Sequence, residues 1–178
     1  MKKITFFLMV AIASSCSSNS TDSKETNKEA ATSTANETTP AYPYTIKQPD
    51  NWGVGSTANT MTALTSIKKW EEGNMDESIK YFADTVRVQF DGLDKSVPRD
   101  TLKNMLAGLW NSYKTVNIKM EDWESVISKD KKQEWVTMWY TEHWETKNGV
   151  KDSAAIINDL QIVNGKIVRL DEYTRKLH

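Results

Sequence analysis

The sequence predicts an α+β domain in which about three helices pack on one face of a curved, mostly antiparallel sheet of four to six strands. Apolar residues recur at helical spacing between residues 57 and 113, and alternate with polar residues from there to residue 174. Two Asn-Gly pairs, Asn148-Gly149 and Asn164-Gly165, separate the long alternating segments. Asn-Gly is the strongest short hairpin signal, so a meander of strands following the helices is expected.

The first sixteen residues are built like a bacterial export signal. Lys2 and Lys3 precede an apolar run from Ile4 to Ala13, which is too short to cross a bilayer because that takes about 20 residues. Ala13-Ser14-Ser15-Cys16 resembles a lipobox, in which the cysteine is lipidated and becomes the new N-terminus. We therefore predict a lipoprotein signal peptide at 1–15 and lipidation of Cys16. Since Ala13 replaces the usual Leu of that motif, an ordinary cleaved signal is the alternative.

The segment after Cys16 has the composition of a tether. Residues 17–40 contain no Val, Ile, Leu, Met or aromatic residue. Such a segment buries too little apolar area to offset its ordering entropy, so 16–50 is predicted to be lipidated at Cys16 and otherwise disordered. A lipid holds a protein at a membrane without a spanning helix. We expect the domain at 51–178 to be lipid-anchored in the bacterial cell envelope, facing the periplasm or the cell surface.

Composition excludes several kinds of site. Cys16 is the only cysteine, which leaves the domain without a disulfide, a Cys-x-x-Cys zinc site or a thiol nucleophile. With 23 basic and 24 acidic residues there is no positive excess for binding nucleic acid. His143 has no second histidine nearby in the sequence, and a glycine-rich phosphate loop is missing. We therefore expect no metal, no cofactor and no nucleic-acid partner.

Three helices are predicted in the first half of the domain. Residues 57–70 carry apolar side chains near helical spacing, from Met61 to Trp70, and contain no Gly or Pro. Asn74-Met75-Asp76-Glu77 has the form of a capping box and begins a second, short helix. Pro98 suits the first turn of a third helix. The stripe of that helix is Leu102, Met105, Leu106, Leu109, Trp110 and Tyr113.

Five segments alternate with period two and are predicted strands. Gly92 is expected to end the first of them, and the Asn-Gly pairs separate the last three. The predicted strands are 84–90, 115–120, 133–146, 152–163 and 166–174.

This order of elements resembles a known superfamily. An Asn74-led helix running into YFADTVRVQF, a Pro98-led helix, and hairpins ending in IVNGKIVRLDEY are similar to the SnoaL-like branch of the nuclear-transport-factor-2-like superfamily. The resemblance extends from Thr57 to about Leu177. It implies a cone-like domain with a pocket between the sheet and its helices. The superfamily includes isomerases, dehydratases, cyclases and members without a known reaction, so we transfer no catalytic assignment.

The Asn-Gly turns predict a register for the sheet. If both loops have two residues, Val163 faces Lys166 and Lys147 faces Val150, and the other pairs follow by counting outward. Asn158 then lies between Trp139 and Asp171. The pocket residues predicted to share this face are Trp139, Asn158, Arg169, Asp171 and Tyr173, with His143 near its end. Apolar walls with a few polar groups are typical of a small-molecule site.

Three residues of this face are candidates for catalysis, each with an ordinary alternative. His143, the only internal histidine, suits a general base, although a solvated histidine is the alternative. Asp171 is a candidate proton shuttle, and the alternative is that it forms an ion pair with Arg169. Tyr173 is a candidate hydrogen-bond donor to a substrate carbonyl, although the tyrosine with that role in the isomerase branch comes from a different element. An Asp171–Arg169 ion pair together with a solvent-exposed His143 would count against the enzyme hypothesis.

Three functions follow from these observations. The favoured one is a membrane-tethered module that binds a small apolar or aromatic ligand without catalysis. The second is an enzyme of the isomerase, dehydratase or cyclase type that uses proton transfer. The third is an interaction protein whose outer sheet face forms a homodimer or docks an envelope partner, because that face is also apolar. Its predicted residues include Val136, Met138, Tyr140, Trp144, Ile157 and Leu170, with Asp159 and Gln161 among them.

Overall fold

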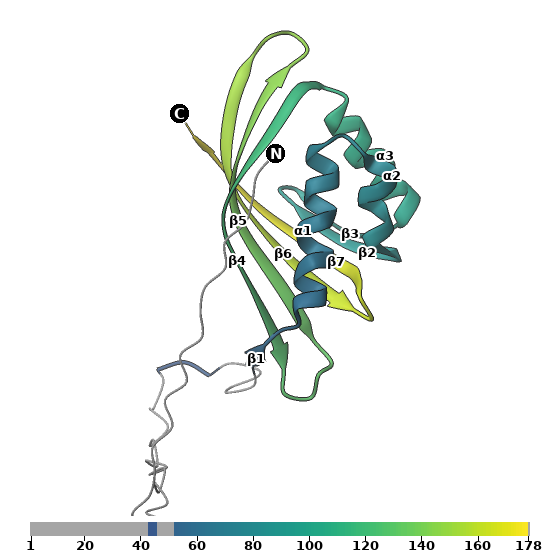
Figure 1. The fold of residues 1–178 in the computed structure, drawn as a ribbon, viewed down its shortest axis with the longest axis vertical. Coiled ribbons are helices and arrows are strands. Elements are labelled where there is room, and N and C mark those ends of the chain that lie inside the picture. Colours follow the sequence, from purple (N-terminus) through teal and green to yellow (C-terminus); the bar gives the residue numbers. More distant parts are fainter. Residues whose placement is uncertain (1–42, 46–51, 178) are drawn as a thin grey trace, which may run out of the picture. The chain divides into compact units, whose positions relative to one another are not determined.

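A computed structural model describes residues 43–45 and 52–177 (Figure 1). The chain divides into two compact units, Met1–Pro43 and Tyr44–His178, and the fold described below is that of residues 52–177 in the second unit. The predicted signal peptide, Cys16 and the tether up to residue 42 lie outside the described residues. Within the described ranges, each helix is too short or too polar to span a bilayer.

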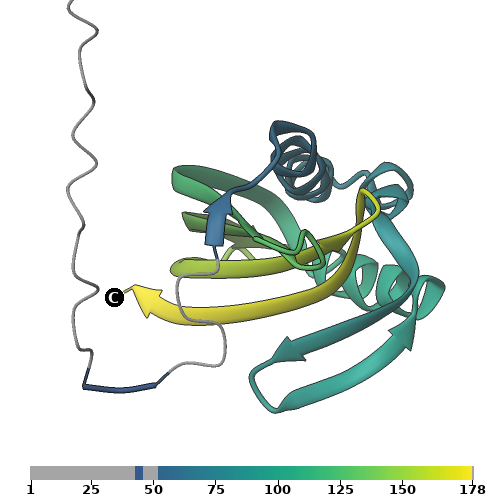
Figure 2. The ribbon, with the colours of Figure 1, turned by 90° about the horizontal axis from the view of Figure 1, so that it is seen from below.

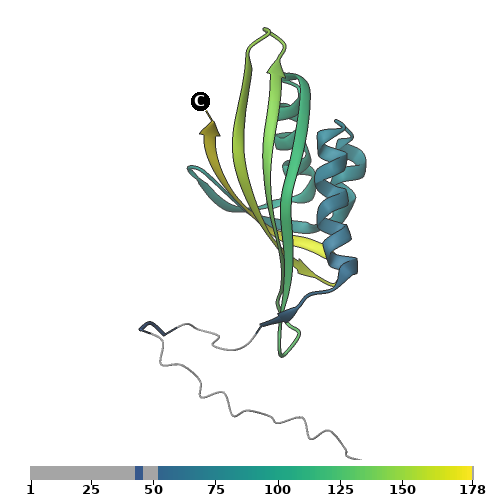
Figure 3. The same cartoon turned by 60° about the vertical axis from the view of Figure 1, so that its left-hand side comes forward.

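A seven-stranded sheet forms the body of the domain. Its strands are β1 (Trp52–Val54), β2 (Phe82–Phe90), β3 (Leu93–Pro98), β4 (Tyr113–Ser128), β5 (Glu134–Thr146), β6 (Lys151–Val163) and β7 (Lys166–Leu177). They lie in the order β1-β4-β5-β6-β7-β2-β3. Only β2 and β7 pair in parallel among these strands. The sheet curves, and the helices cover one of its faces (Figures 1, 2 and 3), which agrees with the predicted α+β class.

The strand count exceeds the predicted four to six because β1 and β3 were missed. β3 follows β2 through a turn at Asp91-Gly92, where Gly92 has a φ of 74°. Asp-Gly is itself a hairpin signal, so Gly92 ends one strand and also allows the chain to return as the next. β1 has three residues, paired with the end of β4, and is too short to show a period.

The helices agree with the prediction, except that the third ends at Trp110 and Tyr113, predicted to belong to its stripe, begins β4. They are α1 (Thr57–Glu71), α2 (Met75–Ser78), which continues as a 3-10 turn at Ile79–Tyr81, and α3 (Arg99–Trp110). The Asn74 side chain accepts a hydrogen bond of 3.2 Å from the backbone N–H of Glu77, as the capping box predicts. Gly73 has a φ of 75°, and a Cβ there would lie 2.7 Å from the Trp110 ring. Glycine therefore lets the α1–α2 turn pack against the end of α3.

The start of α1 is fixed by a buried carboxylate of β5. Glu134 is 7% exposed, and its two oxygens accept hydrogen bonds from the backbone N–H of Ser56 at 2.6 Å and from the Asn59 side chain at 2.7 Å. These bonds satisfy a donor at the helix N-terminus and place its negative charge at the positive end of the helix dipole. They hold α1 over the sheet.

The β6–β7 turn begins in the predicted register and then departs from it. Asn164 and Gly165 have φ values of 50° and 72°, and Val163 faces Lys166 as expected for a two-residue turn. Val168 is then an extra residue in β7, so Gln161, not Leu160, opposes Arg169. A bulge turns the following residues to the other face of the sheet. Asn158 consequently pairs with Glu172 and not with Asp171.

The β5–β6 turn has three residues, so the predicted two-residue turn is wrong. The backbone N–H of Thr146 donates to Val150, and that of Gly149 donates back to Thr146, at 2.8 and 2.9 Å. Only Gly149 of its Asn-Gly pair has positive φ, 81°, whereas a type I′ turn needs two such residues. The longer loop shifts the register by one residue and places Asn158 opposite Met138 instead of Trp139.

The main core lies between the helices and the face of the sheet that carries Met138, which we call the inner face. The opposite face, which carries Trp139, is the outer face. Met138 and Leu102 of α3 are fully buried, and Tyr140 is 2% exposed. The prediction assigned Val136, Met138 and Tyr140 to the face away from the pocket, and the changed register reverses that assignment.

Candidate functional site

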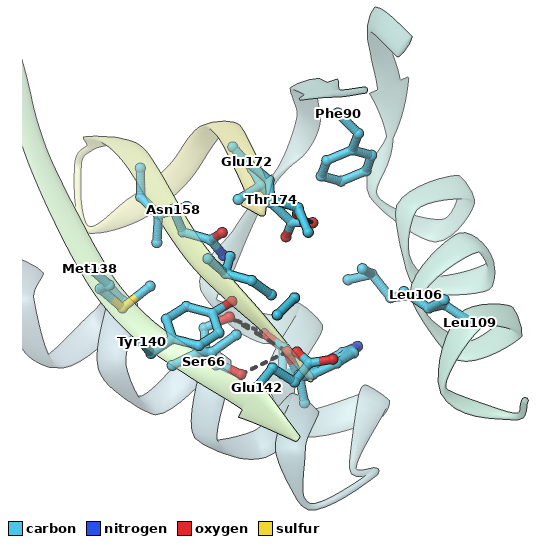
Figure 4. Close-up of a pocket in the computed structure, with 18 of the residues that line it drawn as sticks. Ser66, Phe90, Leu106, Leu109, Met138, Tyr140, Glu142, Asn158, Glu172 and Thr174 are labelled. Atoms are coloured by element: carbon cyan, nitrogen blue, oxygen red, sulfur yellow. Dashed lines mark hydrogen bonds between the residues drawn. The ribbon is translucent and has the colours of Figure 1, made fainter. Parts of the chain in front are cut away.

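A cavity of about 380 Å³ lies between the inner face and the helices. This volume is at the lower end of the range for small-molecule sites, roughly 300–1,000 Å³. Its walls are mostly apolar and come from helices α1, α2 and α3 and from strands β2 and β4 to β7 (Figure 4). Apolar residues that line it include Ala63, Ile67, Phe82, Phe90, Met105, Leu106, Leu109, Met138, Ala154, Ile156, Leu160 and Leu170. The position fits the pocket expected from the sequence, although its residues differ.

Polar side chains enter the cavity from three neighbouring strands. Tyr140 and Glu142 come from β5, Asn158 from β6 and Glu172 from β7 (Figure 4). Asn158 is 4% exposed and Glu142 is 5% exposed. Asn158 and Glu172 are direct partners in the β6–β7 register, so their side chains adjoin on the inner face. The site therefore combines two carboxyl groups, an amide and a phenol within an apolar enclosure.

Two buried polar atoms of the lining have no hydrogen-bond partner among the described residues. One is the acceptor Oδ1 of Asn158, and the other is the donor Nε1 of Trp70, whose side chain lines the α1 side of the cavity. An unsatisfied buried polar group costs about 1–3 kcal/mol. Such groups are retained in native proteins chiefly where a water, an ion or a ligand satisfies them.

Burial makes both carboxyl groups weaker acids than usual. Burial raises the pKa of Glu142 from 4.5 to about 7, and the negative charges of Glu172 and Glu71 contribute to the rise. Burial also raises the pKa of Glu172. The pKa of Tyr140 is raised well above 10, first by burial and then by both cavity carboxylates, while the Asn158 side chain opposes the shift. Glu142 is therefore near half-ionised at neutral pH.

Glu71 connects this group to the sheet edge. Its carboxylate accepts a 2.9 Å hydrogen bond from the backbone N–H of Ile118 on β4 and pairs with Lys68 at 2.7 Å. The hydrogen bond from Ile118 satisfies a backbone N–H on the edge of β4, away from residues 126–128 with which β1 pairs.

Tyr113 at the start of β4 has a pKa raised by burial and by the charges of Glu142 and Glu172. Negative charge thus surrounds Glu142 on the helix and sheet sides.

Only Asn158 among the five predicted pocket residues lines this cavity. Trp139, Arg169, Asp171 and Tyr173 lie on the outer face because of the two register changes, so their predicted place in a shared pocket with Asn158 is wrong. Asp171 is 4% exposed and pairs with Arg169, with 2.6 Å between Nη2 and Oδ2. Arg169 also donates to Gln89 and lies over the Trp135 ring, 5.4 Å from its centroid.

The predicted catalytic residues are not brought to the cavity. Asp171 is ion-paired, as its alternative interpretation proposed, Tyr173 is 63% exposed, and His143 is exposed on the outer face. This is the arrangement that counts against an enzyme built on these residues. A catalytic role for His143, Asp171 and Tyr173 stays a prediction.

Sequence reasoning missed Glu142 and Glu172, although a signal for Glu142 was present. Met138, Tyr140, Glu142 and Trp144 alternate along β5, so Glu142 is a charged residue in an otherwise apolar row. A carboxylate on the buried face of a strand is unusual unless it is paired or functional. Glu172 had no such signal, because the Val168 bulge decides its face.

The outer face carries exposed apolar side chains, including Tyr173 and Ile157, which is 38% exposed. The homodimer was predicted through a face that includes Val136, Met138 and Tyr140, which the structure buries on the inner face. A homodimer through the outer sheet face stays a prediction. Within residues 43–45 and 52–177, His, Cys, Asp and Glu side chains form no group of three or more that could hold a metal ion.

Solved structures resemble this domain in fold. No known family profile matches the chain, and no curated protein matches its sequence. A nuclear-transport-factor-2-like protein of unknown function from Burkholderia pseudomallei aligns with a TM-score of 0.56 and 13% identity, over 67% of this chain and 92% of its own. The structure of an M. tuberculosis LEH-like epoxide hydrolase gives a TM-score of 0.55 and 10% identity, over 67% and 84%. A putative polyketide cyclase from Xanthomonas campestris gives 0.50 and 13%, over 65% and 89%. At these identities the likeness shows the nuclear-transport-factor-2-like fold alone.

The raised pKa of Glu142 predicts a pH-dependent cost to stability that Glu142→Gln removes. Below pH 4.5 the folded and unfolded chains are both protonated at this residue. Between there and about pH 7 only the unfolded chain loses the proton, so wild-type stability falls as pH rises. The variant should therefore gain on the order of 3 kcal/mol relative to wild type across this window, measured by urea unfolding.

Glu145→Gln is the control, because a hydrogen bond from Lys114 lowers the pKa of Glu145. Its effect should have the opposite sign: the stabilising contribution of Glu145 grows as pH rises, so Glu145→Gln should lose stability relative to wild type as pH rises. A stability difference between Glu142→Gln and wild type that stays constant from about pH 4.5 to about pH 8 would contradict the raised pKa.

Proposed function

We propose that the domain binds a small, mostly apolar molecule in the inner cavity. The observation that carries the proposal is the Asn158 side chain, 4% exposed, with an unpartnered Oδ1 in an apolar cavity of about 380 Å³. A ligand with a hydrogen-bond donor would satisfy this acceptor while its apolar part fills the rest of the cavity. The enclosing walls supply hydrophobic affinity, and the polar groups supply orientation.

Filling the cavity should remove the ligand. Ala154 of β6 lines the cavity and is 1% exposed, so Ala154→Leu places three more carbons on its wall. We expect the full chain, purified from its native membrane, to release a small molecule on denaturation, and the variant to release several-fold less. Mass spectrometry of the released fraction measures this.

Ala155→Leu is the matched control, since Ala155 is the next residue of β6 and points to the outer face. It should retain the ligand. Equal occupancy in Ala154→Leu and wild type, or no released molecule from wild type, would contradict binding in this cavity.

Proton transfer is a second candidate function, supported by the pKa of about 7 at Glu142. A base with a pKa near the working pH is suited to general acid–base catalysis. Glu142 would accept a proton from carbon, and the Tyr140 hydroxyl and Asn158 amide would stabilise the developing oxyanion. This chemistry corresponds to the isomerase, dehydratase and cyclase hypothesis. Two of the structures similar in fold are a putative polyketide cyclase and an LEH-like epoxide hydrolase, which is compatible with this hypothesis.

Exchange of the α-protons of cyclohexanone in D₂O tests this candidate by NMR. The wild-type rate should rise with pH through about 7, because only the ionised Glu142 accepts a proton. Glu142→Gln should lower the rate by about 100-fold or more.

Asp159→Asn is the control for the exchange experiment. Asp159 is a carboxyl on the outer face whose pKa is raised by burial, and it accepts a 2.8 Å hydrogen bond from Thr137. Its variant should exchange at the wild-type rate. A wild-type rate no faster than the rate in buffer alone would exclude proton transfer from this probe to Glu142. The ligand-binding proposal would not be affected by that result.

We also propose that a lipid on Cys16 anchors the protein in the bacterial envelope. The lipobox-like Ala13-Ser14-Ser15-Cys16 and the apolar run before it support this. Cys16→Ser should lose incorporation of labelled palmitate in a bacterial host and leave the membrane fraction, whereas Ser17→Ala should behave as wild type. Labelling that persists in Cys16→Ser would contradict the anchor.

A further inference from the structure

We infer that the ligand of the inner cavity carries a basic amine, held as an ammonium group beside Asn158 and Glu172. The inference rests on the proposed binding function and names its ligand class. It depends on the charge of the cavity lining, on the unsatisfied acceptors, and on the aromatic walls.

The lining contains negative charge without a positive partner. Glu142 and Glu172 are its acidic residues, and the described residues that line the cavity include no Lys, Arg or His. Two buried carboxylates elsewhere in the described domain, Asp171 and Glu134, are compensated: Asp171 pairs with Arg169, and Glu134 caps α1. Buried charges in proteins are normally paired, so this cavity lacks a cation that a ligand would supply.

The acceptors lie where one ammonium group can meet them. Asn158 and Glu172 are cross-strand partners, a relation that brings Cβ atoms within about 5 Å of each other. Among the described residues, Asn158 Oδ1 has no partner, and the one hydrogen bond to the Glu172 carboxylate comes from Thr174 at a long 3.4 Å. An ammonium has three N–H donors and no acceptor, which complements a carboxylate and an amide oxygen.

Aromatic side chains also line the cavity that holds these acceptors. Phe90, Tyr113, Tyr140 and Trp144 line the cavity, and the Tyr113 and Trp144 ring centroids are 6.0 Å apart. The faces of such rings attract cations, and their apolar area also favours an apolar body on the amine. An anionic ligand would meet two carboxyl groups without a compensating cation. A neutral alcohol would satisfy one acceptor through its single donor.

Binding of a cation should also release protons. Glu142 faces Glu172 of β7, Glu71 of α1, Tyr140 of β5 and Tyr113 of β4. Lys176 near the end of β7 is two strands from Glu142 in the same cross-strand row, because Ala154 of β6 pairs with both residues. Its side chain is exposed. A bound ammonium favours the ionised form of Glu142, so its partly retained proton should leave near neutral pH. A neutral ligand gives no such release.

Isothermal titration of the full chain with 2-phenylethylamine, 2-phenylethanol and phenylacetate tests the inference. These probes share a ring and differ in the charged or polar group. We expect the amine to bind roughly tenfold or more tightly than the alcohol, and phenylacetate to bind most weakly. Titrations near pH 7 in two buffers of different ionisation enthalpy should show proton release with the amine alone.

Variants separate a direct contact from a change in fold. Glu172→Gln and Asn158→Leu should each weaken the amine by roughly tenfold and leave the alcohol within about threefold. Asp159→Asn, which changes a carboxyl on the outer face, should alter neither.

Equal affinity for the amine and the alcohol, or tighter binding of phenylacetate, would overturn the amine inference while supporting the cavity as a neutral or anionic ligand site. Failure of all three probes to bind would also overturn it. The release experiment with wild type and Ala154→Leu would then still test, independently of these probes, whether the cavity binds a ligand.

Discussion

The bulge at Val168 is the constraint on which the inner cavity depends. Strand residues alternate between two faces, so one extra residue in β7 exchanges the faces of everything that follows it. With the bulge, Leu170 and Glu172 point into the cavity, and Asp171 and Tyr173 point away. The three-residue loop at Gly149 makes the matching adjustment between β5 and β6 and brings Glu142 to the same side.

Neighbouring acids in the chain consequently have different physical environments. Asp171 is buried on the outer face but pairs with Arg169, which itself contacts Gln89 and Trp135. Glu172 faces an apolar cavity whose lining offers it no basic side chain among the described residues, and its pKa rises. Burying a carboxyl group without a partner lowers stability, and proteins tolerate such strain mainly at functional sites. The cavity carboxyl groups are therefore better explained by a ligand or by proton transfer than by folding.

Helix positions could be predicted because their signals are local. The Asn74 cap and the spacing from Met61 to Trp70 depend on residues within one or two turns, and the structure reproduces them. The turn at Asn164-Gly165 is equally local and was also predicted. The residues of the pocket could not be predicted, since the register depends on a bulge at Val168, three residues after Gly165, and on whether Asn148 adopts positive φ. Neither leaves a pattern in the sequence.

The sequence by itself determined the α+β class and the order of the helices and long strands, because periodicity and capping are properties of short segments. The place of a pocket between sheet and helices was implied by the resemblance to the superfamily. The sequence also determined that the domain works without cysteine chemistry. Only the tertiary structure decided which side chains enter the pocket, replacing Trp139, Asp171 and Tyr173 with Tyr140, Glu142 and Glu172 beside Asn158. The physical reason is the two-residue period of a strand, in which a single inserted residue exchanges the two faces.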